Sequence, residues 1–159
     1  MAINISSTNK GAAAALSNFT PHPFIFDGVI CNSMEGFLQS LKFENPEMQA
    51  HVATLVGRKA KFKGKKKKWY TTQTLYWKGI SYKRDSKEYT ELIERAFDAY
   101  AKNTKIQKIL LSTNNAVFEH SMGNRKKNRT VLTSTEFVSN LTRIRNNIQK
   151  QKELEDELK

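Results

Sequence analysis

The stretch Asn32-Ser33-Met34-Glu35-Gly36-Phe37-Leu38-Gln39-Ser40-Leu41-Lys42-Phe43 decides the fold of this chain. Apolar side chains at positions 37, 38 and 41 have the spacing of a helix that buries one face. Glu35, Gln39 and Lys42 recur at intervals of four and three residues, so on that helix they form one stripe. The stretch therefore predicts a short core helix that carries an acid, an amide and an ammonium group along one edge. Asn32 as N-cap with Glu35 three residues later also fits a capping box, which is the ordinary structural interpretation of Glu35.

The length and composition of the chain limit which classes of protein it can belong to. A chain of 159 residues fits one domain with its own core. It has no apolar run long enough to span a bilayer and no N-terminal secretion signal, so we expect a cytoplasmic protein without a membrane partner. A single cysteine excludes an internal disulfide, and three dispersed histidines give no metal-ligand spacing, so we expect neither a metal nor another cofactor. Walker, Rossmann and Gly-x-Ser-x-Gly patterns are absent.

The charge balance favours a polyanionic partner. Lys and Arg number 27 against 15 Asp and Glu, a net charge of +12. The segment Lys61–Lys68 includes four consecutive lysines and is followed by Trp69 and Tyr70. Such a segment could follow a phosphate backbone while aromatic rings stack on bases. It could equally be a solvated loop that supplies only a positive field.

The remaining patterns predict a single α+β domain that is rich in helices and has short strands or hairpins. Hairpins are expected at 23–31, around Asp27-Gly28, and at 74–83, and a short strand at 116–120. Helices are expected to begin near Asn45-Pro46, after Ser86, and at Thr133, where Glu136 completes a second capping box. We expect residues 1–16 to be a loosely ordered lead-in that could hold one edge strand at Ile3-Asn4-Ile5. Residues 17–150 are expected to be the domain, and residues 151–159 the charged end of the last helix.

Several segments, in this order, resemble the NADAR superfamily (NAD- and ADP-ribose-associated, also called YbiA-like). They are Leu16-Ser17-Asn18-Phe19 with Pro23-Phe24 and Asp27-Gly28, then Ser33 to Gln39 with Lys42-Phe43, then Gly57-Arg58, then Leu110 to Ala116 with Glu119, and a last helix with Leu141 and Arg145. Two features differ: Gly36 stands where the family has a histidine, and the family's Asp-x-x-Trp-Gly-x-Gly loop is missing after Glu119. We interpret the chain as a divergent branch of the kind that a phage could carry.

The resemblance implies an N-glycosidase that cleaves a base or an amine from a ribose phosphate or ADP-ribose unit, either in a small molecule or in a modified nucleic acid. Glu35 would then stabilise positive charge at the ribose C1 and position or deprotonate the attacking water.

The resemblance also implies roles in substrate binding for further residues. Lys42 and Arg58 would hold phosphate, and Gln39 and Asn18 would orient the ribose or the base. Phe19, or an aromatic among Trp69, Tyr76 and Trp77, would stack on the base. Glu119 lies in a matching segment, and His120 follows a predicted strand, where an active-site group and a turn-stabilising residue are both plausible.

Two other classes of function stay open. One is a basic nucleic-acid-binding protein on a scaffold that has lost catalysis, which would depend on the lysines at 65–68. The other is a structural or host-interaction protein, whose melting temperature no nucleotide would change.

Overall fold

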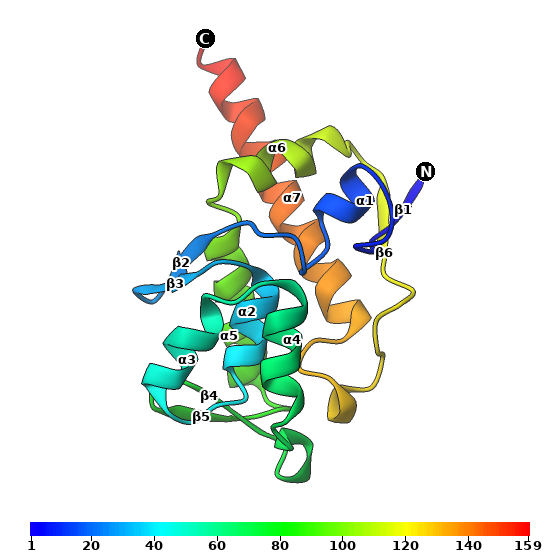
Figure 1. The fold of residues 1–159 in the computed structure, drawn as a ribbon. Helices are drawn as coiled ribbons and strands as arrows, with labels where there is room; N and C mark the ends of the chain where they lie inside the picture. The colour runs from blue at the N-terminus through cyan, green and yellow to red at the C-terminus, as the bar shows by residue number, and fades with distance from the viewer.

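A computed structural model describes the whole chain, residues 1–159. Its helices form the body of the molecule, and three separate two-stranded sheets lie around the edges of that body (Figure 1). The helices are α1 Ala12–Ala15, α2 Met34–Ser40, α3 Pro46–Ala53, α4 Gly57–Lys65, α5 Lys87–Tyr100, α6 Thr104–Ser112 and α7 Ser134–Glu157, with short 3-10 turns η1 Trp69–Thr71 and η2 Lys127–Arg129. The strands are β1 Ala2–Asn4, β2 Phe24–Phe26, β3 Val29–Cys31, β4 Thr74–Trp77, β5 Ile80–Lys83 and β6 Val117–Glu119. None of the helices is both long and apolar enough to cross a bilayer.

The predicted core helix is α2, and it packs against both α3 and α4. Phe37 and Leu41 are completely buried. The Phe37 ring meets Phe24, Phe26 and Trp77 edge-on, with centroids between 5.1 and 6.3 Å apart, a favoured geometry for aromatic pairs. The hairpins β2–β3 and β4–β5 are thus fastened to the core by the helix that the sequence singled out.

The start of α2 differs from the prediction. Ser33, rather than Asn32, is the N-cap: its hydroxyl accepts the Gly36 N–H and donates to the Leu55 carbonyl. Asn32 instead donates its side-chain amide to the Thr54 carbonyl. The capping box with Glu35 is therefore wrong, because the shorter serine side chain closes the helix end. The Glu35 carboxylate is left free for another role.

The lysine-rich segment after Gly57 forms a helix, α4, that its charge pattern concealed. Gly57–Lys65 buries only Ala60 and Gly64, so its contact with the core depends on two small residues. Lysine has good helix propensity, and the small residues allow the backbone to approach α2 closely.

Residues 1–16 are more ordered than the expected loose lead-in. Strand β1 pairs in parallel with β6, with Ile3 opposite Phe118. Ile5 and Leu16 are completely buried, so both ends of this segment belong to the core.

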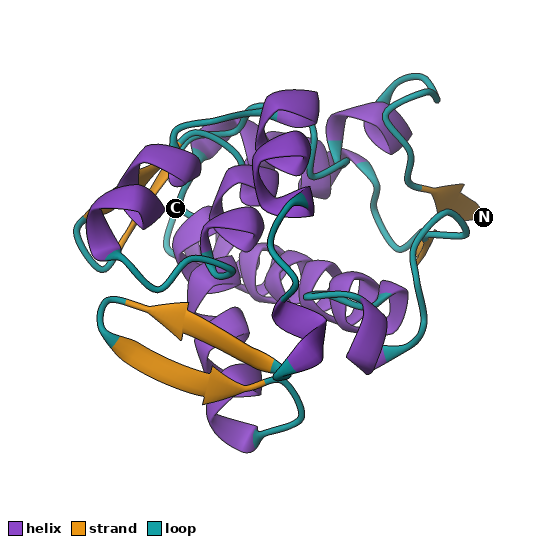
Figure 2. Ribbon diagram, turned by 60° about the horizontal axis from the view of Figure 1, so that its bottom comes forward, coloured by secondary structure: helices purple, strands orange, loops and turns teal.

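Most of the other predicted elements are confirmed. Hairpin β2–β3 turns at Asp27-Gly28, and hairpin β4–β5 turns at Lys78-Gly79. The second hairpin lies at the edge of the helical body (Figure 2). Ser86 caps α5, and Thr133 with Glu136 forms the capping box of α7. All of residues 151–159 are exposed where α7 projects beyond the other helices (Figure 1). The fold is the expected helix-rich α+β domain.

Candidate functional site

A cavity of about 240 Å³ lies beside α2 and is bounded by residues from four separate parts of the chain. Its lining combines a carboxylate, amides, an ammonium group and an imidazole with an apolar floor: Asn18, Phe19, Glu35, Leu38, Gln39, Lys61, His120, Gly123, Asn124, Thr130, Val131, Leu132 and Phe137. Such a mixture of apolar walls and a few convergent polar groups is typical of small-molecule sites.

The two polar residues that α2 contributes are joined to each other. Gln39 donates from Nε2 to Glu35 Oε1 over 2.9 Å, which is possible because one helical turn separates them. This bond also fixes which end of the Gln39 amide is oxygen. No hydrogen bond within the protein reaches Glu35 Oε2, so one carboxylate oxygen stays available in a residue that lines the cavity.

Two glycines allow close packing around α2, one against the Gln39 side chain and one against the backbone of residues 53–55. A Cβ atom at Gly64 of α4 would collide with Gln39 Oε1, so the glycine lets the amide lie flat against α4. A Cβ atom at Gly36 would collide with the carbonyl oxygen of Leu55 and lie 2.8 Å from that of Ala53. The close approach of this backbone explains why no larger side chain stands at position 36.

The electrostatics of Glu35 are set by burial and by two lysines. Burial raises the pKa of the Glu35 carboxyl, and Gln39, Lys42 and Lys61 oppose that rise. Burial also lowers the pKa of the Lys42 ammonium, in spite of the neighbouring Glu35. Because both pKa values move against ionisation, desolvation outweighs the mutual attraction of these charges. Groups held in this way are frequent in active sites.

Asn18 and Phe19 form the wall that precedes α2. The Asn18 carbonyl accepts the Glu35 N–H over 3.2 Å, which ties this wall to the start of the helix. The Asn18 side-chain oxygen is buried without a donor, and it lines the cavity. The Lys61 ammonium lies over the Phe19 ring, 5.9 Å from the ring centroid. A ligand O–H or N–H group would satisfy the Asn18 oxygen, since buried acceptors are normally paired.

The opposite wall is the segment 120–132, which long-range contacts hold in place. Arg84 donates from Nε to the Thr130 carbonyl over 2.8 Å and forms two bonds to the Glu136 carboxylate. Tyr89 donates its hydroxyl to the Val131 carbonyl over 2.6 Å. His120 Nδ1 lies 2.8 Å from the Ile5 carbonyl, so this nitrogen carries a proton and, in the neutral ring, Nε2 is an acceptor.

A second hollow of about 510 Å³ adjoins the cavity and shares His120 with it. Its lining is mostly polar and lies around the start of α7: Glu119, His120, Ser121, Arg125, Ser134, Thr135, Val138 and Ser139. The Ser134 hydroxyl is buried and has no hydrogen-bond partner in the protein.

Comparison with known proteins places the chain in a family. Residues 10–146 match the family described as "Bacteriophage protein GP30.3". The chain belongs to this family. A GP30.3-family relationship agrees with a second finding: the chain is 32% identical, over 149 residues, to an uncharacterized 17.1 kDa protein from the Gp30–rIII intergenic region of Enterobacteria phage T4. That alignment covers 92% of this chain and 98% of the T4 protein.

The fold of this GP30.3-family chain is YbiA-like. The NMR structure of the E. coli protein YbiA superimposes with a TM-score of 0.60 at 15% sequence identity, over 96% of this chain and 89% of YbiA. The similarity in fold and the link to phages, both expected from the sequence, are confirmed at this level.

Most of the residues singled out from the sequence gather at this site. Asn18, Phe19, Glu35, Gln39 and His120 all line the cavity. Lys42 follows the end of α2 and does not line the cavity, but it lies close enough to Glu35 to lower the pKa of that carboxyl. Glu119 lines the adjoining hollow rather than the cavity itself.

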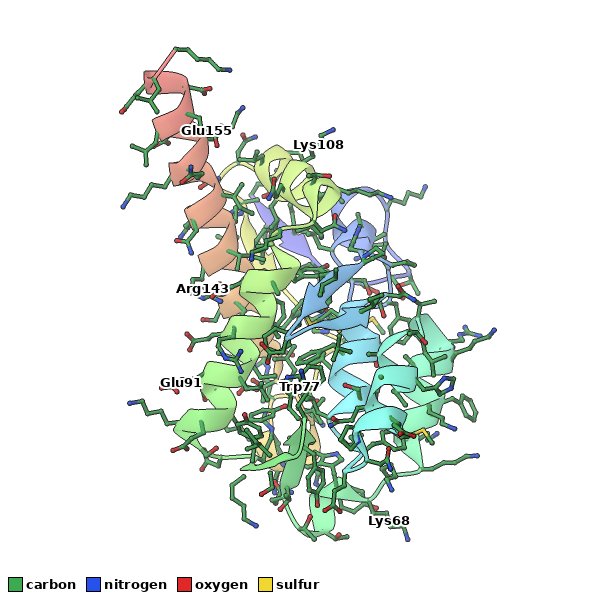
Figure 3. The ribbon with its side chains drawn as sticks, turned by 90° about the vertical axis from the view of Figure 1, so that its left-hand side faces the viewer. Lys68, Trp77, Glu91, Lys108, Arg143 and Glu155 are labelled. Carbon is green, nitrogen blue, oxygen red and sulfur yellow. The ribbon has the colours of Figure 1, made fainter.

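Two predicted residues lie elsewhere. Trp77 is only 2% exposed; its ring stacks on Phe26 and its indole N–H donates to Asp27 over 2.9 Å, in the middle of the molecule (Figure 3). It is therefore a core residue whose face no base can reach. Arg58 is exposed at the start of α4 and does not line the cavity.

Sequence reasoning missed three polar residues of the cavity wall as individuals. Lys61 was included only in a general basic segment, and Asn124 and Thr130 lie in a loop without a motif. The sequence offered no separate signal for Lys61, because the helix that carries it past Gly64 was not predicted. No His, Cys, Asp and Glu side chains come together as a cluster of three that could hold a metal ion.

Proposed function

We propose that this protein is an N-glycosidase that hydrolyses the bond between C1 of a phosphorylated ribosyl or ADP-ribosyl group and the nitrogen of a base or amine. The observation that carries the proposal is the Glu35 carboxylate, partly buried in a small polar cavity, with one oxygen held by Gln39 and the other unpaired. The YbiA-like fold supports it as an analogy, because the sequence segments that resemble the NADAR superfamily supply Glu35 and the residues beside it in the lining, Asn18, Phe19, Leu38 and Gln39.

The reaction needs a fixed negative charge beside C1. As the C1–N bond lengthens, positive charge builds up on C1 and on the ring oxygen, and a carboxylate already oriented in the site stabilises it. A water molecule attacks C1 and transfers its proton to Glu35 Oε2, while the bonding electron pair leaves with the nitrogen. The nitrogen then takes a proton, from Glu35 or from solvent, and the products are the free base and a ribosyl hydroxyl group.

The surroundings of Glu35 fit this role. Burial raises the pKa of Glu35, which makes it a better proton acceptor than an exposed carboxylate, while the Gln39 hydrogen bond, Lys42 and Lys61 oppose that rise. The Gln39 bond keeps the carboxylate from rotating. Asn18 Oδ1 and His120 Nε2 are acceptors for ribose hydroxyls, and Phe19 offers an aromatic surface to the base.

The phosphate of the substrate has a separate place. The adjoining hollow offers Arg125 with the hydroxyls of Ser134, Thr135 and Ser139, and it meets the cavity at His120. Hydroxyls and a guanidinium are the groups that bind phosphate oxygens, and the orphan Ser134 hydroxyl would gain a partner. Lys42 then acts on Glu35 rather than on phosphate.

The proposal is tested by turnover in isotopically labelled water. The protein is incubated in H₂¹⁸O with ADP-ribosylated bases and with ribosylamino-pyrimidine phosphates, and the products are analysed by mass spectrometry. Hydrolysis at C1 releases unlabelled base and places one ¹⁸O on the ribosyl product. Absence of base release from both classes, or label in the phosphate instead of the sugar, would contradict the assignment.

A further inference from the structure

The cations of this chain are concentrated in two segments that contain no Asp or Glu. Residues 48–84 hold eleven Lys and Arg, and residues 120–135 hold four. None of the seven lysines between positions 59 and 68 forms an ion pair. Like charges crowded together without counter-charges repel each other and disfavour the folded state. A surface of this kind gains most from a polyanion that binds to it.

The fold brings both segments to the mouth of the cavity. Lys61 of the first segment lines the same cavity as Asn124 and Thr130 of the second. The side chain of Gln73 joins them directly, since it donates to the carbonyls of Tyr70 and Asn128 over 2.9 and 3.0 Å. Cations of α4 and of the loop 125–129 therefore lie on two sides of the cavity mouth, and we call them the rim. Lys68, which ends the lysine-rich segment, lies at the opposite end of the molecule from Lys108 (Figure 3).

Helix α4 has two flanks that differ in what they face. Ala60 and Gly64 are turned to the core, which places Lys61, Lys65 and Arg58 on one flank by helical spacing. Lys61 lines the cavity, so this flank leads to its mouth. Lys59 and Lys63 are on the other flank, where they line a different hollow with Phe43, and Phe62, between the two flanks, also borders that hollow.

Exposed aromatic rings accompany these cations. Phe62 is 66% exposed at the crest of α4, with the Lys65 ammonium 6.0 Å from its centroid, and Tyr70 is 51% exposed. Apolar rings left in water beside cations are the elements with which proteins hold unpaired bases and their phosphates.

The volume of the cavity limits how much of a ligand can lie inside it. Its volume of about 240 Å³ is below the roughly 300–1,000 Å³ of sites that enclose a whole drug-sized ligand. The cavity therefore accepts one reacting unit and the adjoining hollow accepts its phosphate, so the rest of a larger ligand lies outside both, on the rim, which is cationic.

We propose that the rim binds a single strand of nucleic acid, which crosses the cavity mouth between α4 and the loop 125–129 and presents one of its nucleosides to Glu35. The presentation to Glu35 rests on the proposed N-glycosidase function, whereas the binding of the strand does not. A single strand fits better than a duplex, because stacking on Phe62 and Tyr70 and entry into the cavity both require bases that are not paired.

The experiment measures binding of the full chain to a fluorescently labelled 20-nucleotide single strand of DNA, by polarisation at several salt concentrations. The test variant Arg58→Gln/Lys65→Gln removes two charges from the cavity flank of α4. The control Lys59→Gln/Lys63→Gln removes the same charge from the opposite flank. Each phosphate contact contributes about 0.7 to the slope of log K against log salt for a single strand. The test variant should lower that slope by about 1.4, and the control should leave it nearly unchanged. Phe62→Ala should weaken binding by about fivefold or more, through lost stacking.

Three results would overturn the inference: equal losses for the two double variants, preference for a duplex of the same length, or no binding by the wild-type chain at moderate salt. The Glu35→Gln variant separates this inference from the proposed function, because it should bind the strand like the wild-type chain. A protein that hydrolyses free ribosyl compounds and ignores the strand contradicts only the inference. A protein that binds the strand along this flank and hydrolyses nothing contradicts only the N-glycosidase function.

Discussion

The Gln39 amide donates to Glu35 Oε1 over 2.9 Å, and its own oxygen is packed against Gly64 of the neighbouring helix. The orientation of the candidate catalytic carboxylate thus depends on how closely α4 approaches α2. Helix α4 therefore influences the orientation of Glu35 through Gln39, although it forms no hydrogen bond with Glu35 itself.

Gly64→Ala tests this dependence. The added methyl group collides with Gln39 Oε1 and displaces the amide from Glu35. Loss of one such hydrogen bond should lower kcat/KM by roughly 3- to 10-fold. Lys63→Ala, one residue earlier on the exposed side of α4, is the control and should leave turnover unchanged. Equal activity of both variants would show that Gln39 does not hold Glu35 in the reactive orientation.

The pH profile should reveal the Lys61 charge at the site. Glu35 acts in its ionised form, so the acidic limb of kcat/KM follows its raised pKa and lies above the ordinary carboxyl range. Lys61 lowers the pKa of Glu35, so Lys61→Met should move that limb to higher pH. Lys108→Met, at the far end of the molecule, should not move it. A limb that shifts downward or stays in place for Lys61→Met would contradict the assignment.

Arg84 holds the far wall of the cavity and is the most deeply buried cation of the chain, with 1% of its side chain exposed. Arg84→Met leaves the Glu136 carboxylate and the Thr130 carbonyl without their donor. We expect a loss of about 3 kcal/mol in unfolding free energy, measured by urea denaturation. Lys87→Gln, which breaks only an exposed pair with Glu91, should cost less than about 0.5 kcal/mol.

The pair Arg84–Glu136 also makes the free energy of unfolding depend on pH in the acidic range. Burial alone would raise the pKa of Glu136, but its bonds with Arg84 and Thr133 prevail and hold that pKa below the ordinary value of 4.5. The stabilisation is therefore complete above pH 4.5 and is lost as the pH falls through the lower value of the folded state. In Arg84→Met this acid dependence should be weaker.

His22 should make the fold less stable below neutral pH. It is buried, its Nε2 lies 2.7 Å from the Ala15 carbonyl, and burial lowers its pKa below 6.5. As the pH falls through 6.5, the unfolded chain takes up a proton that the folded chain refuses, so stability declines towards pH 5. His22→Gln keeps a donor for Ala15 but does not titrate. Its stability should change less between pH 7 and pH 5, and an identical decline in both proteins would contradict the prediction.

The sequence predicted best what depends on neighbours along the chain. Ser86 and Thr133 mark helix starts through bonds to residues three positions on, and Glu35 meets Gln39 within one turn. Such contacts can be predicted from residues three or four positions apart in the sequence.

The failures involve contacts between distant residues. Trp77 could not be separated from an exposed aromatic until its indole N–H was seen to reach Asp27, fifty positions away. Helix α4 was concealed because its core contact consists of Ala60 and Gly64, which leave no apolar stripe. The wall formed by Asn124 and Thr130 depends on Arg84, which no spacing connects to the loop.

The most direct test of the central claim is a comparison of turnover and melting temperature for Glu35→Gln. Replacing the carboxylate with a neutral amide of the same shape removes the charge that stabilises C1 and accepts the proton from water, so kcat should fall by about 10²- to 10⁴-fold. The melting temperature should not fall, because desolvation disfavours the ionised carboxyl in the fold. Turnover of a ribosyl substrate at the wild-type rate by the folded Glu35→Gln protein would contradict the account.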